Sequence, residues 1–142
     1  IKQMADIALS LSVSLNAREI ANIVWGLSKL EFDKKPKVVS KLVDCLISSP
    51  KLREQCKAQE ASMIMNVLGK LKIRDEKAFS VLSNILEGQL TEASTQSITN
   101  ALWAHGVVNI PPPPELLGLW AQDRLNLLTV SSTTNAKAND LL

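Results

Sequence analysis

Residues 20–30 read IANIVWGLSKL and carry the clearest secondary-structure signal in the chain. Their apolar residues recur at spacings of three and four, which is typical of one face of an α-helix. That face consists of Ile20, Ile23, Val24, Leu27 and Leu30. The segment therefore predicts an amphipathic helix with one buried side.

The same helix pattern occurs three times. A shift of 41 residues lays residues 16–30 on residues 57–71, and a further shift of 37 reaches residues 94–108. Fourteen of the fifteen positions on the three expected buried faces are apolar, and the other is His105. The second and third copies supply Ala61, Ile64, Met65, Leu68, Leu71, Ile98, Ala101, Leu102, His105 and Val108. Such regular recurrence predicts a helical-repeat protein.

Polar residues mark the expected starts of two of these helices. Asn16 followed by Glu19 is a capping-box pattern, because each side chain can bond a backbone amide that the helix leaves free. Ser94 occupies the matching place in the third copy and is also a good N-cap. Lys57 in the second copy is a poor N-cap, so the sequence gives no clear start there.

A second helix is expected after each copy. The expected spans are residues 36–47, 75–86 and 115–128. Pro36 suits a first turn, Gly88 is a C-terminal stop, and a short helical turn is expected to open at Pro50. The four prolines at 111–114 are expected to be extended. The side chains expected to face inward are Val39, Leu42, Val43, Leu46, Phe79, Leu82, Ile85, Leu86, Leu116, Leu119, Trp120 and Leu127.

The predicted fold class is all-α, an α-solenoid of stacked helical hairpins with about 38–40 residues per repeat. A single hairpin cannot hide its apolar face, and stacking hides it. The expected divisions are residues 1–15 (end of a preceding repeat), 16–56 (repeat 1), 57–93 (repeat 2), 94–128 (repeat 3) and 129–142 (flexible polar tail). The chain begins in a helical pattern with Ile1, so we expect it to be a piece of a longer protein with more repeats.

Composition excludes several classes of protein. The chain has 142 residues, 46% of them hydrophobic, and a formal net charge of +2, which argues against a disordered chain. No apolar run is long enough to cross a bilayer. Two cysteines and one histidine give neither a disulfide framework nor a metal motif, and no catalytic or phosphate-loop motif is present. We therefore expect no catalytic residue, no metal, no cofactor and no small-molecule substrate.

The helix pattern resembles the first-helix signature of octotricopeptide repeats, which runs leucine-alanine-asparagine-leucine-leucine-tryptophan-alanine-leucine-alanine-lysine-leucine. Residues 98–104 (ITNALWA) and 110–115 (IPPPPE) resemble the same family, whose repeats carry a proline-proline-proline-glutamate start before a helix. The likeness covers roughly residues 1–128 and extends to heptatricopeptide, FAST-kinase-like and RAP-related repeats. The second copy departs from it, with Met63 and Asn66 where the other copies have Asn and Trp.

This resemblance implies a non-catalytic RNA-binding protein of a mitochondrion or chloroplast. It would act in RNA processing, stability or translation on single-stranded or ribosomal RNA, and could hold ribosomal RNA as an organelle-ribosome-associated factor. The alternative is a protein-interaction scaffold subunit of a large assembly, docked on ribosomal or other proteins without sequence-specific RNA contact. Residues 1–57 carry a charge balance of +4, which is compatible with a phosphate-bearing partner. The near-neutral total charge and the balance of −2 in residues 58–142 favour the scaffold.

The exposed stripe of each first helix gives the candidate RNA-binding residues. Amide and guanidinium groups can pair with base edges, aromatic rings can stack on bases, and lysines can meet phosphates. The candidates are Arg18, Asn22, Lys29, Gln59, Lys70, Gln96 and Asn100. Trp25 and Trp103 lie on the same stripe, and we expect them to pack against an adjacent repeat, with base stacking as the alternative. Asn22 and Asn100 could instead tie down backbone groups.

Further basic residues open the second helices. The candidate phosphate contacts are Lys34, Lys35, Lys37, Lys41, Lys72 and Arg74, with a solvated surface as the alternative. His105 falls where Leu27 and Leu68 stand in the other copies, so we expect it in the core. Cys45 and Cys56 are expected to be free, buried or half-buried thiols.

Overall fold

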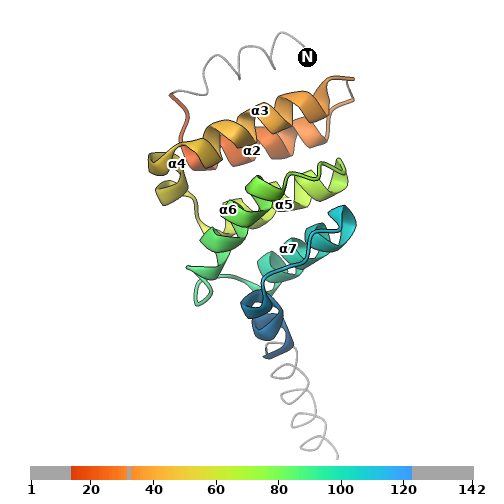
Figure 1. The fold of residues 1–142 in the computed structure, drawn as a ribbon. Helices are drawn as coiled ribbons and strands as arrows, with labels where there is room; N and C mark the ends of the chain where they lie inside the picture. The colour runs from red at the N-terminus through yellow and green to blue at the C-terminus, as the bar shows by residue number, and fades with distance from the viewer. Residues whose placement is uncertain (1–13, 32, 123–142) are drawn as a thin grey trace, which may run out of the picture.

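The computed structural model describes residues 14–31 and 33–122 (Figure 1). These described ranges contain helices and connecting loops without a strand, which confirms the all-α prediction. The helices are α2 (Ala17–Ser28), α3 (Lys35–Ser48), α4 (Pro50–Gln55), α5 (Ala58–Lys70), α6 (Glu76–Glu87) and α7 (Thr95–Val108), and residues 114–122 are also helical. The predictions for residues 1–13 and 123–142, including the polar tail and Leu127, lie outside the described residues.

The helices form two layers (Figure 1). The first helices of the three copies, α2, α5 and α7, contact one another in that order, while α3 contacts α6 in the second layer. Within each pair, α2 packs on α3 and α5 packs on α6. The layers are joined by apolar side chains, and all fifteen positions of the expected buried faces are buried or half-buried. The inward faces were thus predicted correctly.

The predicted helix starts are confirmed at Asn16 and Ser94. The Asn16 Oδ1 atom accepts a hydrogen bond from the Glu19 amide at 2.8 Å, and the Asn16 amide donates to Glu19 Oε1 at 3.0 Å. The Ser94 hydroxyl accepts from the Ser97 amide at 3.1 Å. Lys57 makes no side-chain cap at the start of α5. The short helix α4 opens at Pro50 as expected.

Distant glutamines satisfy two helix N-termini. Gln89 Oε1 accepts from the Ala58 amide at 2.9 Å, and its Nε2 donates to the Cys56 carbonyl at 2.9 Å. Gln55 Oε1 accepts from the Ala17 amide at 3.3 Å. Each glutamine therefore caps the first residue of a first-layer helix from a point after that hairpin's second-layer helix.

Gly88 ends α6 as predicted, with a φ of −67° that needs no left-handed conformation. One helix start differs from the sequence prediction. Helix begins at Pro114 rather than Glu115, because proline fits a first turn where its missing amide costs no bond. Ile85 is half-buried and packs against the core, in agreement with its predicted inward face.

His105 is a core residue, as predicted, with 2% of its surface exposed. Its Nδ1 lies 3.0 Å from the Ile110 carbonyl, and its Nε2 lies 2.8 Å from the Ser83 hydroxyl. A carbonyl can only accept, so Nδ1 carries the proton and Nε2 accepts from the Ser83 O–H. The ring also meets Phe79 edge-on, at a centroid distance of 4.9 Å. The imidazole therefore ties α7 to α6 and to the loop that follows α7.

Candidate functional site

The exposed stripes of α2, α5 and α7 lie side by side in one layer. We call this surface the first-layer face. Its residues are Arg18, Asn22, Trp25 and Lys29 of α2, Gln59, Met63, Asn66 and Lys70 of α5, and Gln96, Asn100, Trp103 and Val107 of α7. All twelve are exposed or half-buried. The seven candidate RNA-binding residues thus occupy a single surface of the structure.

Two neighbouring pockets lie on the first-layer face. The larger, of about 470 Å³, lies between α5 and α7 and is reached by Trp25 of α2; we call it the amide pocket. The smaller, of about 300 Å³, lies between α2 and α5; we call it the arginine pocket. Gln59 and Met63 line both, so the pockets adjoin. Five candidates line them: Arg18, Asn22, Gln59, Gln96 and Asn100.

The amide pocket takes its name from four amide side chains. Gln59 and Asn66 enter from α5, and Gln96 and Asn100 from α7. In the described part of the chain, none of these four amides forms a side-chain hydrogen bond with the protein. The Asn22 side chain in the arginine pocket likewise forms no hydrogen bond with the described residues. The alternative that Asn22 and Asn100 tie down backbone groups is therefore wrong. Their polar atoms remain available to a ligand.

The serines of the amide pocket behave differently. The Ser62 hydroxyl donates to the Gln59 carbonyl at 3.0 Å, and the Ser94 hydroxyl donates to Ser97 Oγ at 3.0 Å. These hydroxyls already hold helix turns. The pocket therefore presents free amides on a wall of internally bonded serines.

The two tryptophans of this face are half-exposed. Trp25 exposes 46% of its surface and Trp103 exposes 45%. Trp103 packs on α5, where a Cβ atom added to Gly69 would lie 3.0 Å from its ring. Packing against a neighbouring repeat is thus observed for Trp103, and both tryptophans still expose a large part of their surface to solvent. An exposed indole face is a stacking surface for a base or another planar group.

A pair of lysines stands at the far end of α2 and α5. Lys29 Nζ lies 4.9 Å from the centre of the Trp25 ring. Desolvation and the nearby Lys29 charge both lower the pKa of Lys70, so the two ammonium groups are close together. Two adjacent like charges create a local attraction for an anion such as a phosphate.

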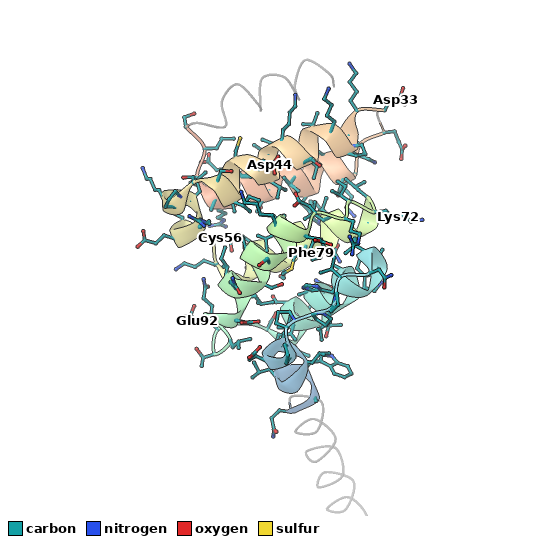
Figure 2. All side chains as sticks on the ribbon, viewed as in Figure 1. Asp33, Asp44, Cys56, Lys72, Phe79 and Glu92 are labelled. Carbon is teal, nitrogen blue, oxygen red and sulfur yellow. The ribbon has the colours of Figure 1, made fainter. Side chains whose placement is uncertain are left out.

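The candidate phosphate contacts do not line either pocket of this face. Lys34, Lys35, Lys37 and Lys41 lie at or along α3, in the second layer. The Lys35 ammonium donates to the Leu30 carbonyl at 3.0 Å, at the end of α2. Lys72, with a φ of 56°, follows α5 and lies at the opposite end of the helices from Glu92 (Figure 2).

Arg74 is also engaged within the protein. Its Nε donates to the Val108 carbonyl at 3.2 Å, and its Nη1 donates to Glu76 at 2.7 Å. The first contact joins the loop before α6 to the end of α7. A phosphate at Arg74 or Lys35 would compete with these internal bonds.

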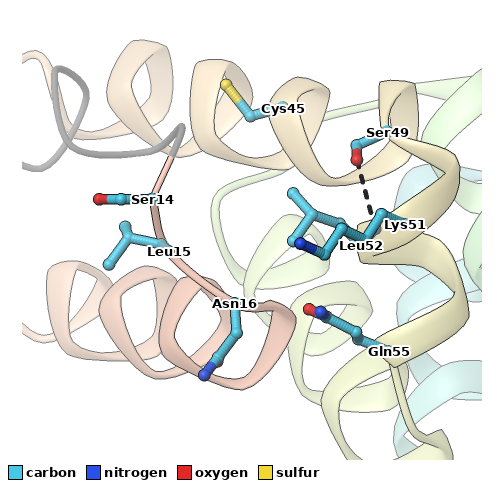
Figure 3. A pocket seen from close by; sticks show the side chains of 8 residues that line it. All are labelled: Ser14, Leu15, Asn16, Cys45, Ser49, Lys51, Leu52 and Gln55. Carbon is cyan, nitrogen blue, oxygen red and sulfur yellow. Dashed lines mark hydrogen bonds between the residues drawn. The ribbon is translucent and has the colours of Figure 1, made fainter.

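Another pocket, of about 520 Å³, lies away from the first-layer face, at the start of α2 and the junction of α3 and α4 (Figure 3). Three of its polar side chains already satisfy helix ends. The Ser49 hydroxyl accepts from the Leu52 amide at 3.3 Å, and Asn16 and Gln55 cap α2. Size alone therefore does not make it the better site.

Other site chemistry is limited within residues 14–31 and 33–122. These residues hold no group of three or more His, Cys, Asp or Glu side chains placed to bind a metal ion. None of their helices is long and apolar enough to span a membrane. Cys45 is half-buried and Cys56 buried, both outside any disulfide, as predicted.

Comparisons with known proteins add no identification: a scan of protein-family models, a search of curated proteins and a search of solved structures each found no match. The assignment of the first-layer face as the candidate site therefore depends on the geometry of the structure alone. Sequence reasoning missed Glu92, which lines the amide pocket from the loop before α7. Loop residues carry no helical periodicity, so no sequence signal pointed to it.

Proposed function

We propose that the chain is a non-catalytic RNA-binding module whose hairpins stack as an α-solenoid. The RNA would lie on the first-layer face and cross α2, α5 and α7 in turn. One observation carries the proposal: candidate residues from three separate helices line two adjoining pockets, and their amides have no partner within the described protein. Free amides, exposed indoles and paired lysines match base edges, base faces and phosphates respectively.

The resemblance to octotricopeptide repeats also suggests a cellular location and a process for this RNA binding. It favours RNA processing, stability or translation in a mitochondrion or chloroplast. Ribosomal RNA on an organellar ribosome is one ligand that fits such a role.

A protein-interaction scaffold is the second candidate function. Trp103 and Val107 are one helical turn apart on α7 and expose 45% and 39% of their surfaces. A pair of exposed apolar side chains at this spacing can receive an apolar residue of a partner helix or peptide. Such docking would depend little on salt, whereas phosphate contacts weaken steeply as salt rises.

The test is fluorescence-polarisation binding of the chain to a randomised single-stranded RNA pool at low and physiological salt. The test variant combines Arg18→Glu with Gln96→Ala. The matched control combines Lys77→Glu with Asn84→Ala, which likewise reverses one positive charge and removes one amide, but on α6 in the second layer. Both Lys77 and Asn84 are exposed.

We expect the wild-type chain to bind with a steep salt dependence. The test variant should bind at least about tenfold more weakly, with a shallower salt slope because one phosphate contact is lost. The control should stay within about twofold of the wild type. Equal losses of RNA affinity in both variants would contradict the proposal that RNA binds the first-layer face. Absence of RNA binding at low salt would favour the protein-interaction scaffold.

A further inference from the structure

The amide pocket has one charged lining residue, Glu92, among otherwise neutral side chains. Glu92 lies in the loop between α6 and α7, beside the start of α7 (Figure 2). Its side chain is exposed and makes no internal ion pair among the described residues. A carboxylate at a pocket wall accepts hydrogen bonds and repels acceptors, so it biases what the pocket can hold.

The pocket has the size of a small-ligand site. Its volume of about 470 Å³ falls within the ~300–1,000 Å³ typical of pockets for small molecules, so one nucleobase fits easily. The Trp25 ring and the Met63 thioether provide apolar wall, and the unpaired amides of Gln59, Asn66, Gln96 and Asn100 provide donors and acceptors. This is the combination that reads an unstacked base by stacking and by its edge.

The adjoining arginine pocket supplies a place for the strand on either side of that base. Arg18 and Lys57 line it together with one carboxylate, Glu60, so its formal charge balance is positive. It shares Gln59 and Met63 with the amide pocket. A nucleotide whose base enters the amide pocket can therefore keep a flanking phosphate near two cations.

We propose that the amide pocket holds a single unstacked base that carries an exocyclic amino group, and that Glu92 selects for that group. This inference rests on the proposed RNA-binding function. Cytosine presents its N4 amino group as a donor, which a carboxylate accepts. Uracil presents O4 in the same place, and this oxygen is repelled by the carboxylate. The pocket therefore prefers cytosine over uracil, two bases of the same size.

The test compares oligocytidylate with oligouridylate of equal length, by fluorescence polarisation at low salt. The variants are Glu92→Gln, which keeps the side-chain shape and adds an amide donor, and Glu54→Gln as the matched control. Glu54 is exposed on α4 and lines neither pocket of the first-layer face. The control separates a general gain in RNA affinity, caused by losing a negative charge, from a change in base preference.

We expect the wild-type chain to bind oligocytidylate at least about fivefold more tightly than oligouridylate. Glu92→Gln should bring that ratio close to one, chiefly by tightening oligouridylate binding, while Glu54→Gln should leave the ratio unchanged. Equal binding of both homopolymers by the wild type, or a preference that survives Glu92→Gln, would overturn the inference and leave RNA binding itself standing. If neither homopolymer binds, the inference falls together with the proposed function.

Discussion

The indole of Trp103 lies so close to Gly69 that a Cβ atom at residue 69 would stand 3.0 Å from the ring and 3.1 Å from the Ala104 Cα. Gly69 is on α5 and Trp103 on α7, so two first-layer helices approach each other closely here. Of the five glycines, Gly69 is the one where an added Cβ atom would meet its neighbours at the shortest distance. The absence of a side chain at residue 69 lets the ring of one repeat rest on the backbone of another.

Gly69→Ala should destabilise the chain. Alanine favours a helix over glycine by ~1 kcal/mol, but separating α5 from α7 costs about 1–3 kcal/mol, so we expect a net loss. Gly106→Ala is the matched control, because Gly106 has the same place in the third copy and nothing within 4 Å of an added Cβ. Urea denaturation should show a lower midpoint for Gly69→Ala and a raised one for Gly106→Ala. A gain in both would disprove the close contact.

Gln89→Ala should remove two bonds that hold the start of α5. It leaves the Ala58 amide and the Cys56 carbonyl without their partner, at a cost of about 1–2 kcal/mol in the free energy of unfolding. Gln55→Ala removes one longer bond to α2 and should cost less. Asn84→Ala, on the exposed side of α6, serves as the control in thermal denaturation. Equal stability of all three variants would mean that these glutamines do not cap the helices.

His105 should make the free energy of unfolding depend on pH. Desolvation lowers its pKa from 6.5, against the Ile110 bond, which raises it. The unfolded chain therefore takes up the proton more readily than the folded chain, and stability falls as pH drops through the ordinary histidine range. Urea midpoints should be lower at about pH 5.5 than at about pH 7.

The control for this pH dependence is His105→Leu, which installs the residue found at the matching places in the other copies. It should be less stable at neutral pH, because Ser83 and Ile110 lose their partner, but its midpoint should change less between the two pH values. The wild-type slope persisting in His105→Leu would assign the titration to another group.

The two thiols should differ sharply in reactivity. Burial, together with the nearby Glu60 charge, raises the pKa of Cys56 to about 12, so thiolate is scarce at neutral pH. Cys45 is half-buried. In the folded chain we expect Cys56 to be alkylated at least about tenfold more slowly than Cys45, measured by peptide mass spectrometry. Equal rates in the folded chain would contradict the buried position of Cys56; in urea both should react.

Periodicity predicted much of this fold because the buried face of a helix is determined by residues that are close together in the sequence. The spacing of Ile20, Val24 and Leu27 predicts a buried face, and the Asn16–Glu19 pair predicts a helix start; both are confirmed. The long-range caps were not predicted, since Gln89 lies 31 positions from Ala58 and nothing in its surroundings marks it as a cap.

The sequence likewise predicted only part of the candidate site. The helical repeat indicated that Arg18, Gln59 and Gln96 share a surface, and they line two adjoining pockets. It could not show that Lys35 is engaged at the end of α2 or that Glu92 reaches the amide pocket. Both facts depend on how loops bring distant side chains together, which one-dimensional spacing does not encode.

The most direct test of the central claim is ultraviolet photo-crosslinking of the chain to unmodified single-stranded RNA of mixed sequence, with the cross-linked peptides mapped by mass spectrometry. The account predicts cross-links on α2, α5 and α7, concentrated around Trp25, Met63 and Asn100. Cross-links confined to α3 and α6, or none at RNA concentrations that saturate any binding, would contradict it.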